Sequence, residues 1–105
     1  ILEIYTTLTV IGAHMGGWSV WDDAAMRLAG HKNFYVDCSS TFPFIEKDKV
    51  KEIIRHYGAD RVLFGTDYPM WPYKEELESF FSMGLDENEI ESILNINAKK
   101  LFNLE

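Results

Sequence analysis

The chain alternates short apolar runs with amphipathic helical patterns, and no other sequence feature restricts its fold as strongly. Runs rich in β-branched residues predict buried strands at 8–13, 33–38 and 61–65. Apolar residues at helical spacing predict helices over about 19–29, 47–57, 74–83 and 87–102. Strands separated by helices pair in parallel through right-handed crossovers, so the sequence predicts an α/β fold with three parallel strands. Periodicity alone leaves open whether they belong to an open doubly wound sheet or to part of a closed barrel.

Several residues indicate where the predicted helices begin, end and bury their apolar faces. Ser19 is the expected cap of the first helix, and Gly30 and Gly58 end the first two helices. The second helix should bury Val50, Ile53, Ile54 and Tyr57. The last helix should bury Ile90, Ile93, Leu94, Ile96, Ala98, Leu101 and Phe102.

Composition limits the class of protein. A chain of 105 residues that is 47% hydrophobic suits one globular unit over residues 1–105. Its formal net charge of −7 disfavours nucleic acids and anionic membranes as partners. Cys38 is the only cysteine, which rules out an internal disulfide and fits a reducing cytoplasm. No apolar run approaches the ~20 residues that a membrane-spanning helix needs.

Titratable and small residues follow the predicted strands, where parallel α/β folds place their ligands. His14 follows the first strand beside Gly16 and Gly17, and Asp67 follows the third strand. An imidazole and a carboxylate at one sheet edge favour an acid/base or metal-hydroxide site. Asp67 would be an oxygen ligand to a divalent ion such as zinc, and His14 would exchange a proton with activated water. The paired glycines would let the backbone pass close to the site.

Structural roles compete with these functional ones. A lone histidine is more often structural, and Asp67 could simply be a turn carboxylate before Pro69. Structural roles are favoured for the strand carboxylate Asp37, the loop hydroxyls Ser39 and Ser40, the buried thiol Cys38, and the helix-end histidines His31 and His56.

Four segments together resemble one enzyme family. Residues 10–17 end an apolar strand in His-x-Gly-Gly, and residues 61–69 end another in Gly-Thr-Asp-Tyr-Pro. Residues 34–39 lie between them, and residues 97–102 hold Asn-Ala before Leu-Phe. In this order they resemble strands six to eight and the closing helix of the amidohydrolase-related (amidohydrolase 2) family of metal-dependent (β/α)₈ barrels. The resemblance implies that residues 1–105 are the C-terminal segment of such a barrel.

The resemblance also implies residue roles. Asp67 would be the strand-eight metal ligand, and His14 the strand-six histidine near the metal-bound water or substrate. The family's other ligands, a His-x-His pair and a strand-five histidine, have no counterpart in these residues. We therefore expect a divalent metal, zinc in the first instance, in the full-length enzyme, and none necessarily on this segment alone. Trp18, Tyr68 and Trp71 are candidates for the substrate pocket.

The expected function is part of a metal-dependent hydrolase or decarboxylase. It would act on a small carboxylic acid or ester through metal-activated water and would be inactive as this segment alone. An incomplete barrel exposes a strand edge and an apolar face, so we expect self-association or docking to the rest of the barrel. A non-catalytic oligomerisation or interaction module is the second hypothesis, and a small flavodoxin-like domain that binds an anion is the third.

Overall fold

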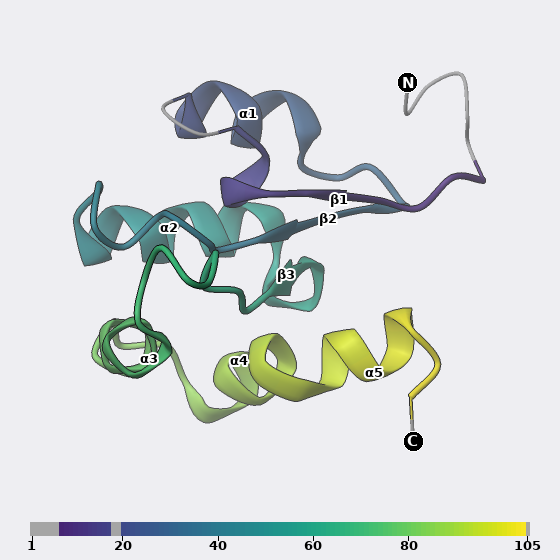
Figure 1. The fold of residues 1–105 in the computed structure, drawn as a ribbon. Coiled ribbons are helices and arrows are strands. Elements are labelled where there is room, and N and C mark those ends of the chain that lie inside the picture. The colour runs from purple at the N-terminus through teal and green to yellow at the C-terminus, as the bar shows by residue number, and fades with distance from the viewer. Residues whose placement is uncertain (1–6, 18–19, 105) are drawn as a thin grey trace.

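Three parallel strands form one sheet in the computed structural model, which describes residues 7–17 and 20–104. The strands are β1 (Val10–Gly12), β2 (Phe34–Asp37) and β3 (Val62–Leu63). They lie in the order β1-β2-β3, and β2 pairs in parallel with both neighbours (Figure 1). The predicted parallel sheet is confirmed, with each strand shorter than the sequence pattern suggested.

Five α-helices follow the predicted helical patterns. They are α1 (Trp21–Leu28), α2 (Lys47–Tyr57), α3 (Tyr73–Phe81), α4 (Glu87–Glu91) and α5 (Asn97–Leu101). A π-helical turn, η3 (Ser92–Ile96), joins α4 to α5, so the predicted last helix is one run with a wider turn inside it. The expected cap Ser19 lies outside the described residues. Within residues 7–17 and 20–104, none of the helices has the length and apolar character of a membrane span.

Polar side chains fix the C-terminal helices against the sheet. Asp86 and Glu89 form a capping box at the start of α4: Asp86 accepts from the Glu89 backbone N–H at 2.8 Å, and Glu89 accepts from the Asp86 backbone N–H at 3.1 Å. The buried Asn97 amide donates to the carbonyl oxygens of Ala59 at 2.6 Å and Val62 at 2.7 Å. These bonds tie α5 to the beginning of β3, beside which Figure 1 shows the helix.

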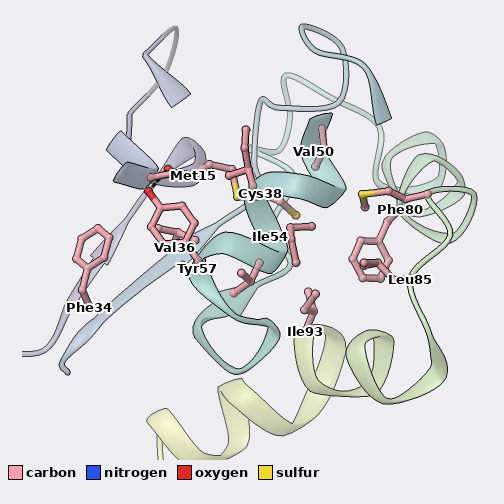
Figure 2. Close-up of a cluster of buried hydrophobic side chains, with 14 residues drawn as sticks. Met15, Phe34, Val36, Cys38, Val50, Ile54, Tyr57, Phe80, Leu85 and Ile93 are labelled. Atoms are coloured by element: carbon pink, nitrogen blue, oxygen red, sulfur yellow. Dashed lines mark hydrogen bonds between the residues drawn. The ribbon is translucent and has the colours of Figure 1, made fainter. Parts of the chain in front are cut away.

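The core lies between the sheet and α2, with α3 and η3 closing one side (Figure 2). All four residues predicted for the apolar face of α2 are buried, and Val50 and Ile54 are fully so. The largest fully buried side chains elsewhere include Phe80, Met15, Ile93, Val36 and Val62. The burial predicted for the last helix is confirmed fully only at Ile93. Phe102 is 55% exposed, because α5 ends at Leu101. The remaining predicted residues are half-buried: Ile90, Leu94, Ile96, Ala98 and Leu101.

The sheet face opposite α2 is only partly covered. Phe34 and Val36 face the core, so the pleat directs Tyr35 and its register partner Ile11 to the other side. Ile11 is 39% exposed, and Tyr35 is half-buried with the Arg61 guanidinium 5.0 Å from its ring centroid.

Phe80 and Phe81 offer a matched test of the core, since they are adjacent on α3 and identical in type. Phe80 is fully buried against Phe64, whereas Phe81 is 54% exposed. We expect Phe80→Ala to lower the free energy of unfolding by about 3–5 kcal/mol. Phe81→Ala should lower it by about 1 kcal/mol, because it loses mainly the ring contact with Phe80. Urea unfolding measures both values, and equal losses would contradict the described core.

The buried thiol of Cys38 predicts a pH dependence of stability. Burial raises its pKa from 9.0 to about 12, so the folded chain keeps the proton that the unfolded chain releases above pH 9. Stability should therefore fall between pH 9 and 12, by up to about 1.4 kcal/mol per pH unit from this group. Burial also raises the pKa of Tyr57, from 10.0 to about 12, which acts in the same direction.

The variant Cys38→Ala isolates the thiol contribution. Urea unfolding at pH 8, 9, 10 and 11 should give a shallower loss of stability for the variant than for the parent, while the Tyr57 contribution remains in both. Identical slopes would show that the thiol is not held protonated by burial.

Candidate active site at the strand ends

His14 is held in a strained turn directly after β1. The 3-10 segment η1 (His14–Gly16) has left-handed backbone angles, with φ of 54° at His14 and 58° at Met15. The Tyr57 hydroxyl of α2 donates to the Met15 carbonyl at 2.9 Å and so fixes the turn from behind. A Cβ at Gly16 would come 2.9 Å from that hydroxyl, so glycine is required there. The turn thus presents His14 at the C-terminal end of the strand.

Asp37 and Ser39 surround His14 at the end of β2. One oxygen of Asp37, Oδ1, accepts from the His14 backbone N–H at 3.2 Å and from the Ser39 backbone N–H at 3.1 Å. It also accepts from the Ser39 hydroxyl at 2.5 Å. The imidazole Nδ1 of His14 lies 3.0 Å from the Ser39 carbonyl oxygen and 3.0 Å from Ser39 Oγ. The imidazole is therefore fixed to the loop after β2 by its inner nitrogen.

Ser40 and Trp71 hold Asp67, which follows β3. The Ser40 hydroxyl donates to Asp67 Oδ2 at 2.7 Å, and the Trp71 indole N–H donates to Ser40 Oγ at 2.9 Å. Asp67 has a left-handed backbone, with φ of 59°, and its carbonyl accepts from the Met70 N–H at 2.9 Å in the turn that follows. One carboxylate oxygen of Asp67 is thus directed by the serine, and the residue as a whole is exposed.

Two consecutive serines connect the two candidate residues. Ser39 contacts His14 and Ser40 contacts Asp67, and both serines are buried in the loop after the middle strand. His14 and Asp67 therefore lie at the same C-terminal edge of the sheet, on opposite sides of this loop. The sequence had favoured capping and structural roles for the serines and Asp37. The sequence did contain one signal for a role in the site: these residues end or follow the second predicted strand, which lies between the strands that precede His14 and Asp67.

The residues proposed to line a substrate pocket differ in their surroundings. Trp71 is half-buried, with its ring edge-on to Phe44 at a centroid distance of 5.6 Å. It also borders a shallow cavity of about 240 Å³ that Phe42 and Glu76 line, and burial raises the pKa of the Glu76 carboxyl. Tyr68 is 77% exposed. Trp18 lies outside the described residues.

The donor set fits only part of a metal site. Asp67 is an oxygen donor whose second oxygen the Ser40 hydroxyl leaves available. Within the described part of the chain, no three histidine, cysteine or acidic side chains are grouped so that they could hold a metal ion. A zinc site takes four ligands, so Asp67 could contribute to such a site without completing it.

Solved structures contain the same arrangement of strands and helices. A TIM-barrel protein from Bordetella bronchiseptica is 30% identical, with 98% of this chain and 37% of that chain covered and a TM-score of 0.78. A 2,6-dihydroxybenzoate decarboxylase from Rhizobium is 22% identical, with the same coverage and a TM-score of 0.77. A dihydroxybenzoic acid decarboxylase from Polaromonas, with bound manganese and the inhibitor 2-nitroresorcinol, is 25% identical; 98% of this chain and 36% of that chain are covered, with a TM-score of 0.73.

These likenesses define the chain as one portion of a barrel, since it spans about 37% of the length of the first two structures. No curated protein sequence matches the chain significantly. The family model described as amidohydrolase matches residues 1–104. The chain belongs to the amidohydrolase family, and its three parallel strands with their helices form part of a TIM barrel.

Proposed function

We propose that the chain supplies one side of the active site of a metal-dependent hydrolase or decarboxylase. Residues 1–105 would be the C-terminal segment of the barrel, with β1, β2 and β3 as its strands six to eight. The observation that carries the proposal is the pair of serines that holds His14 and Asp67 at one sheet edge. The dihydroxybenzoate decarboxylases among the similar structures support a small carboxylic acid as the substrate of a decarboxylase. If the enzyme is a hydrolase, the proposed substrate is an ester.

Asp67 is the proposed metal ligand. Its Oδ2 accepts from Ser40, and Trp71 in turn donates to that hydroxyl, which fixes the direction of the serine proton. The other oxygen is then left to face a cation, with further ligands coming from other strands of the barrel. A divalent ion held there, for which the sequence predicts zinc, would supply a Lewis acid that polarises a substrate oxygen and lowers the pKa of bound water. Manganese bound to the Polaromonas enzyme supports a divalent ion of this kind.

His14 is the proposed acid/base residue. Its imidazole is held by Nδ1, which leaves Nε2 to transfer a proton to or from water or substrate. Trp71 and the exposed Tyr68 would offer aromatic surface to a small aromatic acid. The chain's own residues thus orient one ligand, hold one proton-transfer group and contribute part of the pocket wall.

Replacing Asp67 tests the metal assignment in the complete barrel that contains this chain. Asp67→Ala should reduce the divalent metal content from about one ion per chain to near zero, since a ligand is lost. It should also lower decarboxylation or hydrolysis at least ~100-fold. Elemental analysis and turnover of dihydroxybenzoate or an ester measure the two effects.

Asp60 provides the control, because its side chain is a 79% exposed carboxylate at the opposite end of β3. Asp60→Ala should leave metal content and turnover as in the parent. An Asp67→Ala protein that keeps its full metal content would contradict the assignment.

The partly covered sheet face favours a second candidate function, that of an interaction module. Ile11 is 39% exposed on that face, and β1 pairs only with β2 among the described strands. A strand edge beside exposed apolar surface is a surface for association. We propose that this face docks to the remainder of the barrel. When the remainder of the barrel is missing, the same face would associate with a second copy of the chain.

Light scattering during size exclusion tests this association without metal. The 105-residue chain should elute as a dimer or larger species, and Ile11→Lys should shift it towards the monomer. Met26→Lys is the control, because Met26 is 75% exposed on α1, where it lies beside Ile53 and His56 of α2. A parent chain that is monomeric at all concentrations tested would refute the association.

A further inference from the structure

Asp37 receives three hydrogen bonds on one oxygen. Its Oδ1 accepts from the backbone N–H groups of His14 and Ser39 and from the Ser39 hydroxyl. Backbone N–H groups can only donate, so this oxygen acts as an acceptor towards its neighbours. The shortest of the three bonds, 2.5 Å, is the one from the hydroxyl.

The bond from Ser39 to Asp37 determines where His14 carries its proton. A serine hydroxyl has one proton, and in Ser39 that proton is directed to Asp37. Towards His14 Nδ1, at 3.0 Å, the hydroxyl oxygen can therefore only accept. The Ser39 carbonyl, also 3.0 Å from Nδ1, can only accept as well. Both neighbours of Nδ1 are acceptors, so Nδ1 carries the proton and Nε2 of the neutral ring carries the lone pair.

We propose that Asp37 is a positioning residue that sets the tautomer of His14. By taking the Ser39 proton, it prevents the hydroxyl from donating to Nδ1 and so keeps Nε2 unprotonated. This inference rests on the proposed function only in giving Nε2 a task, which is to accept a proton from water or substrate. The tautomer itself is a property of the three side chains and can be measured without metal or substrate.

The surrounding backbone makes the arrangement specific. His14 has its φ at 54° and Ser40, which follows Ser39, has its φ at 49°. Both are left-handed conformations that surrounding contacts must sustain. Asp37 binds the turn at His14 and the loop at Ser39 simultaneously, so the residue that directs the hydroxyl proton also fixes the distance between ring and hydroxyl.

The experiment is nitrogen-15 NMR of the histidine rings at about pH 8.5, two units above the ordinary histidine pKa. Long-range proton–nitrogen correlations distinguish the protonated from the unprotonated ring nitrogen. The chain has three histidines, and His31→Gln and His56→Gln assign the remaining signals to His14. In the parent chain, we expect the His14 ring to carry its proton on Nδ1.

Three variants separate positioning from simple structural support. Asp37→Ala frees the Ser39 proton to donate to Nδ1, so the ratio of the Nε2–H to the Nδ1–H form should rise by about fivefold, the effect of one net hydrogen bond. Asp37→Asn keeps an acceptor oxygen and should retain the parent tautomer. Ser39→Ala should also retain it, because the backbone carbonyl still accepts from Nδ1.

The outcomes decide the inference directly. If the parent chain carries the His14 proton on Nε2, the proposal is refuted. This measurement needs no variant, so it can be made even if Asp37→Ala does not fold. A folded Asp37→Ala chain with an unchanged tautomer ratio also overturns the proposal. Loss of the metal assignment, shown by a metal-loaded Asp67→Ala barrel, would leave the tautomer result intact and would remove only the proposed function.

Discussion

The pairing of β2 with a parallel strand on each side is the constraint on which the site depends. β1 and β3 each pair with β2, so their C-terminal ends lie on either side of the loop that follows Asp37. That loop brings Ser39 to His14 beyond the end of β1 and Ser40 to Asp67 beyond the end of β3. A shift of either strand by one residue would exchange the sheet faces and separate these partners.

Most of the described non-glycine residues with a left-handed backbone lie at this same edge of the sheet. Of the five described non-glycine residues with positive φ, four lie there: His14, Met15, Ser40 and Asp67. Such conformations cost of order 1–3 kcal/mol each. The hydrogen bonds of Asp37, Ser40 and Tyr57 offset this strain, and the core beneath holds their backbones in place. The concentration of strain at the strand ends is consistent with a site rather than with an ordinary connecting loop.

The sequence predicted the parallel sheet, the extent of α2 and its buried face, because strong periodicity reflects burial directly. It predicted less well where order depends on contacts distant in sequence. The π-helical turn inside the last helix and the exposure of Phe102 follow from how that helix meets the sheet. Likewise, the functions of Ser39 and Ser40 depend on which strand ends lie beside their loop. Hydroxyl groups carry no periodic signal, so only the strand order revealed their partners.

In the proposed barrel, this segment and the remaining strands would contribute differently to the metal site. Ser40 and Trp71 fix Asp67, while Ser39 and Asp37 fix His14. The proposed ligand and the proposed acid/base residue would therefore be oriented without the cation. The number of ligands, in contrast, depends on strands beyond β1, since the described residues bring no three metal-binding side chains together. Orientation is therefore local to these three strand ends, whereas affinity for the ion would arise only when the barrel closes. In the proposed site, the loop of residues 39–41 would set both the proton position on His14 and the orientation of Asp67.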